Sequence, residues 1–418
     1  MPTCTLDSPG TPDYCSDCAS AFFAGVLIGI LASTGAARPT PHKAGSPTPA
    51  RRPLHVLETP SRPRPAPSPF ATPSTPSTSP SSLGSPVRLA APAKPPEHPE
   101  QQYLYLVRNI LDHGERRATP KGVGALALPA PSPLRFALSR PVDPSDPCSH
   151  LESVVPLLTT RHIRFKSVVE ELLWMVQGKT DAHDLASHIW DANSSREYLD
   201  GRGLVEYSEG DIGPGYGFQW RHAGAVYRGK DESYEGEGVD QLSRVVESIQ
   251  HEPEKRKHIM CAWNVADLDK MALAPCPCLV QFYVHSPPPS TSSTFSTTAE
   301  PPPRLSCIVY QRSADVALGL AFDIAVYALL AHVVARLTGT VAAELVFLLG
   351  DAHVYYDHVD GLRRQLERAP TGAGFPTVKL ARTREELEAR GGVDGLEASD
   401  FELEGYAPAG SIKFKLHP

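Results

Sequence analysis

The chain has 418 residues, of which 43 are proline, and it carries a formal net charge of −7. This slightly acidic balance gives no reason to expect nucleic-acid binding, which relies on an excess of Lys and Arg. The eight cysteines are irregularly spaced, which fits free thiols in a reducing compartment better than the disulfide framework of a secreted protein.

Residues 1–99 are predicted to form a low-complexity extension rich in Pro, Ser and Thr. The segment 39–99 holds 18 of the 43 prolines and almost no large apolar side chains. It cannot bury a core, so we expect it to be mostly disordered. The uncharged run 19–37 precedes it and could be a membrane anchor, a signal peptide core or an error in the gene model. Its many Gly, Ala and Ser residues argue against an anchor, and the acidic residues before it argue against a signal peptide.

The remaining residues, 100–418, suffice for one large domain. Apolar residues recur at helical spacing over 101–113, and a second helical pattern covers 165–177 and ends at Gly178. Glu171 lies beside the apolar stripe of that second helix. Its carboxylate is therefore either at a solvated edge or in a cavity that raises its pKa.

Two polar, proline-bearing insertions interrupt this domain, at 141–153 and 285–304. We expect the second to extend a hairpin on the surface, because it lies between two strand-like segments. The segment 322–337 is apolar nearly all round and predicts a helix buried at the centre of the domain. The first turn of that helix carries Asp323.

Cys276 stands between Pro275 and Pro277, directly before the apolar run Leu279 to Val284. The prolines hold the backbone extended, and the apolar run predicts a buried strand with the thiol at its mouth. A thiol is nucleophilic as the thiolate, and Arg312 could supply the positive charge that this form needs. The alternatives are a redox or metal pair with Cys278, which the Cys-x-Cys spacing disfavours, or an inert buried cysteine.

From residue 100 to the end, the chain resembles the thymidylate synthase family in eleven segments that occur in the family's order. The most informative are Glu170-Glu-Leu-Leu-Trp174, Ile189-Trp-Asp-Ala-Asn193, Glu209-Gly-Asp-Ile-Gly-Pro-Gly-Tyr-Gly-Phe-Gln-Trp-Arg-His222, Tyr310-Gln-Arg-Ser-Ala-Asp315 and Gly350-Asp-Ala-His-Val-Tyr355. The resemblance implies an α+β fold, with a large mixed β-sheet covered by helices and a homodimer formed through the sheet face.

The family's activity is a methyltransferase reaction, the reductive methylation of dUMP to dTMP. The resemblance implies 5,10-methylenetetrahydrofolate as the donor of the one-carbon unit and the hydride, with dihydrofolate as the second product. It implies no metal and no nucleic-acid partner. It also implies a cytoplasmic location, with the nucleus or the mitochondrion as alternatives and the membrane only if 19–37 is an anchor.

The resemblance assigns a role to each matching residue. Cys276 would be the nucleophile, Glu171 would relay protons, and Tyr216 would belong to the proton-abstraction network. Arg256 and Lys257 would reach the nucleotide phosphate of the other subunit. The other nucleotide-binding positions would be Lys121, Arg312, Ser313, Ala314, Asp315, Asp323, His353, Val354 and Tyr355, and the folate-binding positions would be Trp190, Asn193, Asp315, Gly319 and His417. From the residues alone, Arg312 and Asp315 could equally form a surface ion pair, and His353 and Tyr355 could be satisfied core groups.

The chain departs from the family at several of these positions. Pro120 and Lys121 replace the phosphate-clamping arginine and its neighbour, Pro277 replaces a histidine, and Asp323 replaces the asparagine that reads the pyrimidine. An ionised Asp323 offers only acceptors, which suits the amino group of cytosine better than O4 of uracil, whereas a protonated one could donate to O4. Asp323 could instead cap the buried helix. The alternatives to the dUMP activity are therefore a methylase or hydroxymethylase acting on dCMP, or a weakly active or inactive nucleotide-binding paralogue.

Overall fold

The computed structural model describes residues 98–417 except 120–121, 144, 146–149 and 287–301. The expectations for the run 19–37, for the proline-rich segment, for Lys121 and for most of the insertion 285–304 lie outside the described residues. The helices and strands follow as the structure has them.

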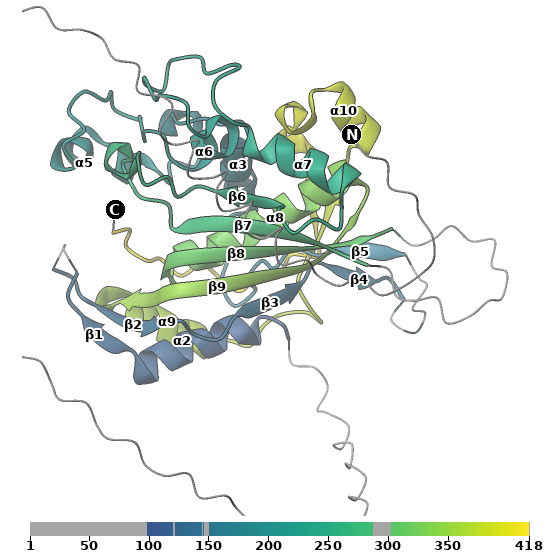
Figure 1. Ribbon diagram of the computed structural model, residues 1–418. Helices are drawn as coiled ribbons and strands as arrows, with labels where there is room; N and C mark the ends of the chain where they lie inside the picture. Colours follow the sequence, from purple (N-terminus) through teal and green to yellow (C-terminus); the bar gives the residue numbers. More distant parts are fainter. Residues whose placement is uncertain (1–97, 120–121, 144, 146–149, 287–301, 418) are drawn as a thin grey trace, which may run out of the picture. The chain divides into compact units, whose positions relative to one another are not determined.

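A mixed seven-stranded sheet lies at the centre (Figure 1), as expected. Its order is β1-β2-β9-β8-β7-β6, and β3 pairs with β9 beyond the end of β2. All neighbours are antiparallel except β8 and β9, which a crossover through a helix makes parallel. The strands are β1 (Glu115–Arg117), β2 (Ala125–Pro129), β3 (Leu134–Ala137), β6 (Ile259–Cys261), β7 (Pro277–His285), β8 (Arg304–Asp315) and β9 (Val341–Tyr355).

The crossover helix is α8 (Gly319–Thr338), and it is buried on almost every side, as its apolar sequence predicts. Among the described residues it is the one helix long and apolar enough to cross a membrane, but 83% of its most apolar window is buried inside this fold. It begins at Gly319, about one turn before the expected start at Phe322. No side chain caps its first turn, so the sequence carries no capping signal at this point. Asp323 therefore lies in the second turn.

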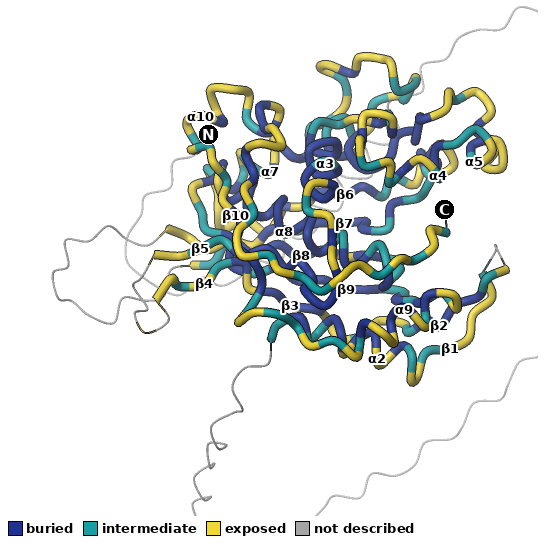
Figure 2. The backbone as a smooth tube through the Cα atoms, turned by 180° about the vertical axis from the view of Figure 1, so that it is seen from behind, coloured by how far each residue is buried: buried dark blue, intermediate teal, exposed yellow. Residues whose placement is uncertain are grey.

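Two predicted helices precede the sheet's long strands. α2 (Gln101–His113) has the bounds that its periodicity predicts, and α3 (Phe165–Val176) ends before Gly178, whose φ of +72° suits glycine. α8 and α6 pack against α3 and leave it buried along most of its length (Figure 2), so the Glu171 carboxylate does not lie at a solvated edge.

Shorter elements complete the fold. The insertion at 141–153 closes a two-stranded hairpin, and the strands flanking the insertion at 285–304 pair at His285 and Arg304, so it does extend a hairpin. The shorter elements are β4 (Ser139–Pro141), β5 (Leu151–Ser153), α4 (Asp191–Ser194), α5 (Arg196–Gly201), α6 (Tyr216–His222), α7 (Gln241–His251), α9 (Val359–Leu366), β10 (Thr377–Leu380), α10 (Arg384–Ala389) and β11 (Phe401–Glu404), with 3-10 turns η1 (Ala182–Asp184), η2 (Leu268–Lys270), η3 (Tyr356–His358), η4 (Gly392–Gly395) and η5 (Ala398–Asp400).

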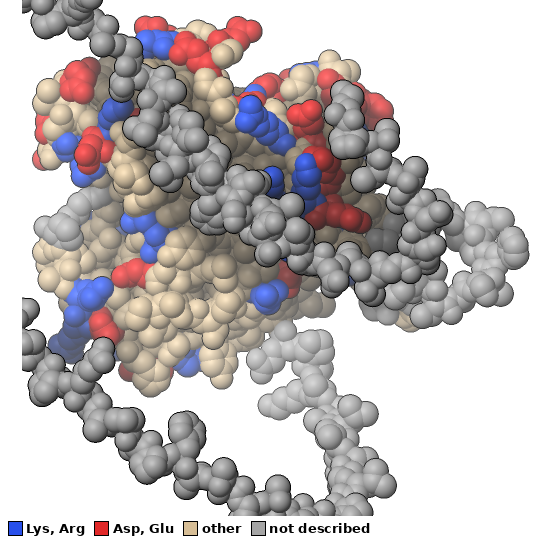
Figure 3. Space-filling model, viewed as in Figure 1, with Lys and Arg blue, Asp and Glu red and all other residues tan. Residues whose placement is uncertain are grey.

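The two faces of the sheet differ. One face packs on α8, while β7, expected to be wholly buried, alternates between buried and open positions. The register places the open positions of β6 to β9 on the other face, which bears four exposed large apolar side chains, Ile259, Tyr283, Tyr310 and Leu348. The part of the surface over β8 and β9 that Figure 3 leaves uncovered shows few charged side chains.

Candidate active site

Cys276 immediately precedes β7, and its backbone N–H and carbonyl each make one hydrogen bond. Its N–H donates to the Tyr216 hydroxyl at 2.9 Å, and its carbonyl accepts from the Arg312 N–H at 2.8 Å. Tyr216 opens α6 with a φ of +29°, an unusual value for a residue other than glycine. Such strained positions cluster at functional sites, so this outlier supports a functional role for Tyr216.

The Arg312 side chain fastens the loop before the thiol. Its guanidinium donates to the carbonyls of Pro275 at 2.8 Å and Ala274 at 2.6 Å, and it lies 5.4 Å from the ring centroid of Trp263. The alternative of a surface ion pair with Asp315 is not what the structure has, because that carboxylate accepts from backbone N–H groups at the start of α8.

Arg312 lowers the pKa of the Cys276 thiol, as expected, but burial has the larger and opposite effect. Burial, and after it the negative charge of Asp323, raises the pKa of the Cys276 thiol to about 11. The positive charge of Arg312 and the bond to Tyr216 lower the pKa, as expected, but they are outweighed. The thiol is therefore protonated at neutral pH, because desolvation disfavours its charged form.

Glu171 lies in a buried site, which decides between the two alternatives for it. Only 6% of the residue is exposed, and its carboxylate accepts from Trp190 Nε1 at 2.7 Å. Burial raises the pKa of Glu171 to about 7, while the bond from Trp190 lowers it. The Trp190 ring in turn meets Tyr216 edge-on at 5.6 Å, so α3, α4 and α6 bring three predicted site residues together.

Asp323 accepts a bond from Gln311 Nε2 on β8 at 2.8 Å. Burial, then the charges of Glu171 and Asp315, raises its pKa well above the usual range, and the bond from Gln311 only partly opposes this. Burial therefore favours the neutral form of this carboxyl. The capping alternative is wrong, because the N-cap of α8 is Leu318 and no side chain caps it. Gly319 leaves room here, since a Cβ on it would lie 3.7 Å from Asp323 Oδ2.

Two buried amide atoms in this region have no hydrogen-bond partner among the described residues, Asn193 Nδ2 and Gln311 Oε1. Buried polar groups are normally paired, so these two atoms are free to bond an ordered water or a polar ligand. The half-buried Asp315 carboxylate and the ring of Trp190 lie in the same network.

Strand β9 supplies the residues expected at the sugar. His353 Nδ1 lies 3.1 Å from Asp351 Oδ1, and its ring meets Tyr355 edge-on at 5.2 Å. Val354 is buried on the opposite side of the strand, and Ala314 is fully buried on β8. These last two positions can offer a ligand only their backbone groups; Ser313, next to Ala314, is partly exposed.

Other predicted residues lie apart from this cluster. Arg256 and Lys257 are exposed between α7 and β6 and are not brought to Cys276 within one chain. His417 lies against Tyr355, with ring centroids 4.4 Å apart, and its Nε2 bonds the Asp357 carboxylate at 3.0 Å.

Sequence reasoning missed three residues of the site: Gln311, Tyr327 and His358. Gln311 is 1% exposed on β8, and Tyr327 follows Asp323 by one helical turn. His358 is fully buried, with Nδ1 3.7 Å from Asp315 Oδ1. The only sequence signal for Gln311 was its position directly before Arg312, whereas the place of His358 depends on the tertiary fold.

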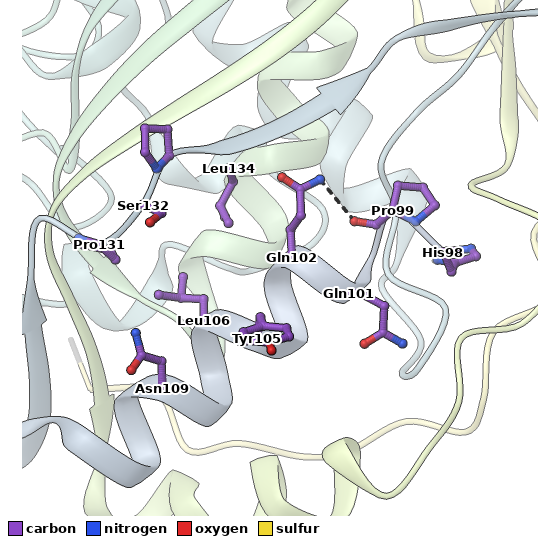
Figure 4. A pocket seen from close by; sticks show the side chains of 11 residues that line it. His98, Pro99, Gln101, Gln102, Tyr105, Leu106, Asn109, Pro131, Ser132 and Leu134 are labelled. Carbon is purple, nitrogen blue, oxygen red and sulfur yellow. Dashed lines mark hydrogen bonds between the residues drawn. The ribbon is translucent and has the colours of Figure 1, made fainter. Parts of the chain in front are cut away.

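A cavity of about 390 Å³ lies elsewhere, between α2 and the start of β3 (Figure 4). His98, Tyr105 and Leu134 are among its lining residues, and Gln102 donates to the Pro99 carbonyl at its rim. None of the predicted site residues lines it. The hydrogen-bonded polar cluster around Cys276 therefore marks the site better than this hollow does.

Comparisons with known proteins agree with this geometry. A sequence model of the family described as "Thymidylate synthase" matches residues 101–417. The chain is 46% identical over 322 residues to thymidylate synthase of Agaricus bisporus, covering 76% of this chain and 99% of the relative. It is 43% identical to that of Saccharomyces cerevisiae and 41% identical to that of Homo sapiens, covering 96% and 91% of those proteins and 76% and 77% of this chain. The chain therefore belongs to the thymidylate synthase family and has its methyltransferase function.

Proposed function

We propose that this chain converts dUMP to dTMP at the cluster around Cys276, with the thiol sulfur adding to C6 of the pyrimidine ring. 5,10-Methylenetetrahydrofolate supplies the one-carbon unit and the hydride. The observation that carries the proposal is the continuous arrangement of Cys276, Tyr216, Trp190 and Glu171, in which each neighbouring pair is hydrogen-bonded or in ring contact. This arrangement connects the proposed nucleophile, Cys276, to the proposed proton carrier, Glu171.

The two raised pKa values suit the proton movements of this reaction. A carboxyl whose pKa is about 7 gives up and takes back a proton easily at neutral pH, which suits Glu171 as the relay. A neutral Asp323 adds no negative charge beside Cys276, so the thiol loses a proton more easily than it would beside an ionised one. Arg312 then stabilises the thiolate.

The neutral state of Asp323 also favours uracil. While Oδ2 accepts from Gln311, a protonated Oδ1 can donate to O4 of uracil. The second candidate is action on dCMP, which an ionised Asp323 would favour by accepting from the cytosine amino group. An Asp323→Asn variant separates the two: faster turnover of dUMP and loss of any dCMP turnover would identify Asp323 as the selector, and unchanged rates on both would dismiss that role.

A homodimer through the open sheet face completes the proposal. Four exposed apolar side chains on this face suit burial against a second copy, and Arg256 and Lys257 make no contact with the site of their own chain. In the dimer both would reach the phosphate in the partner's site, together with Arg312 and Lys121. We place this enzyme in the cytoplasm.

The direct test measures dihydrofolate formation from dUMP and methylenetetrahydrofolate by the full-length chain. We expect Cys276→Ser to lower kcat by roughly a thousandfold or more, because the hydroxyl is a far poorer nucleophile. The matched control is Cys261→Ser, at a half-buried thiol on β6, which should keep its rate. Equal loss in both variants, or no loss in Cys276→Ser, would contradict the assigned nucleophile.

A further inference from the structure

Three side chains of the kinds that bind metals converge where the C-terminal tail meets η3. His417 Nε2 lies 3.0 Å from both carboxylate oxygens of Asp357, and His358 Nε2 lies 3.9 Å from Asp357 Oδ1. One ligand atom from each residue lies within 4.8 Å of the other two. Because Asp357 and His417 are 60 positions apart, the sequence contains no recognisable metal spacing here.

We propose that Asp357, His358 and His417 bind one transition-metal ion of the Zn²⁺ class. Zinc bonds to imidazole nitrogen and carboxylate oxygen are about 2.0–2.2 Å long, so tetrahedral ligand atoms lie roughly 3.3–3.6 Å apart. The separation of 3.0 Å between His417 and Asp357 is shorter than this, and that of 3.9 Å between His358 and Asp357 is longer. Small side-chain rotations would bring the three atoms around one ion.

The surroundings of His358 support a ligand role. Its side chain is fully buried, and its Nδ1 has no hydrogen-bond partner among the described residues but faces Asp315 Oδ1 at 3.7 Å. A histidine that binds a metal through one nitrogen usually directs the other toward a carboxylate, which sets the tautomer. Asp315 is placed to be that carboxylate.

A fourth oxygen is also at hand. The Lys415 carbonyl lies 2.7 Å from His358 Nε2, so it can join the coordination when the ion replaces the proton between them. The Asp357 side chain is 38% exposed, which leaves an entrance from solvent, whereas the His417 side chain is only 5% exposed. The site is therefore enclosed on the side of the protein and open on the side of the solvent.

The bound ion would fasten the C-terminal tail beside the proposed nucleotide site. His417 packs on Tyr355, and His358 faces Asp315. An ion that holds both histidines would restrain the tail at this edge and slow the entry and release of substrates. The binding itself does not depend on the proposed reaction, so it can be tested without an activity measurement.

The test uses the full-length chain with Cys276→Ser, which removes one of the eight thiols, and titrates it with Co²⁺ followed by Zn²⁺. We expect one equivalent of Co²⁺ to give a visible d–d band that depends on His417 and Asp357, and Zn²⁺ to displace it. His417→Gln and Asp357→Asn should each weaken binding at least about tenfold, because each removes one charged or imidazole ligand. His113→Gln, at an exposed histidine ending α2, is the control and should bind as before.

The two variants guard against a folding artefact, because they lie on different segments and both keep the side-chain volume. Thermal unfolding of each variant without metal should match the parent closely. No d–d band at micromolar Co²⁺, or equal binding by His417→Gln, would overturn the proposal and leave Asp357 and His417 as an ion pair alone.

Discussion

At the scale of the residue, burial of Glu171 lowers the free energy of unfolding at neutral pH but gives the carboxyl the pKa that the reaction needs. Its folded pKa is raised from 4.5 to about 7, so the stability linked to this group is fully present below pH 4.5 and is lost as the pH rises through 7. Above pH 7 the cost is roughly 3 kcal/mol. We expect Glu171→Gln, which can still accept from Trp190, to be more stable than the parent by about 2–3 kcal/mol in urea unfolding at pH 8, and to turn over dUMP at least about a hundredfold more slowly.

Glu170→Gln is the control for this prediction. Glu170 is next in sequence and pairs with Lys166 near the surface at 3.8 Å, so its loss should change stability by less than about 0.5 kcal/mol. At pH 4 the Glu171→Gln advantage should disappear. A variant equally stable at both pH values, or one with full activity, would show that the Glu171 carboxyl is neither strained by burial nor used in catalysis.

The sequence predicted the identity of the site residues better than their chemical state. Cys276 and Glu171 stand in recognisable segments, but the raised pKa of each depends on burial by helices from distant parts of the chain. Asp323 lies close enough to raise the pKa of the thiol when it is ionised, although 47 positions separate the two in the sequence. Such couplings follow from the fold, so the effect of burial on the pKa of the thiol could not be predicted from the sequence.

At the scale of the element, the start of α2 is joined to the C-terminal tail through Glu100. This residue is fully buried, and its two carboxylate oxygens accept from the N–H and hydroxyl groups of Thr159 and Thr160. The Thr159 carbonyl accepts from Ala409, and Arg368 bridges Thr160 to Gly410. We expect Glu100→Gln to lower the free energy of unfolding by about 3 kcal/mol, since it leaves buried donors unmatched.

Urea unfolding followed by circular dichroism measures this loss, and Glu115→Gln on the exposed strand β1 is the matched control. The control should lie within about 0.5 kcal/mol of the parent. Equal stability of both variants would show that the Glu100 bonds do not hold the tail segment in solution.

Elements were predictable where local pattern and packing agree. α2 has a single apolar face and matched its expected bounds. The local pattern of α3 left open whether Glu171 lies at a solvated edge, and packing against α6 and α8 decides that it is buried. The start of α8 was missed by one turn because its N-cap residue, Leu318, makes no side-chain capping bond and so gives no signal in the sequence. Tertiary contacts decide both of these differences.

At the scale of the whole molecule, the proposed dimer makes each active site a product of two chains. Cys276→Ser and Arg256→Glu proteins should each be nearly inactive, because one lacks the nucleophile and the other the donated phosphate ligand. When they are mixed and allowed to exchange subunits, half of the dimers carry one intact site, so activity should return to about a quarter of the parent value. Arg244→Glu, on the exposed side of α7, replaces Arg256→Glu in the control mixture.

Activity that does not return on mixing, in dimers shown to have exchanged, would place Arg256 outside the partner's site. A monomeric parent chain in analytical ultracentrifugation would contradict the dimer itself. Tyr310→Asp on the open sheet face should separate the dimer, since it places a charge in the centre of the apolar surface.

The most direct measurement is tritium release from C5-labelled dUMP and C5-labelled dCMP by the full-length chain, with methylenetetrahydrofolate present. We predict release from dUMP with one dihydrofolate formed for each tritium, release from dCMP slower by at least about a hundredfold, and none from either with Cys276→Ser. Release from dCMP alone would make an ionised Asp323 the selector of the base. Release from neither would contradict the assignment of the cluster around Cys276 as a working active site.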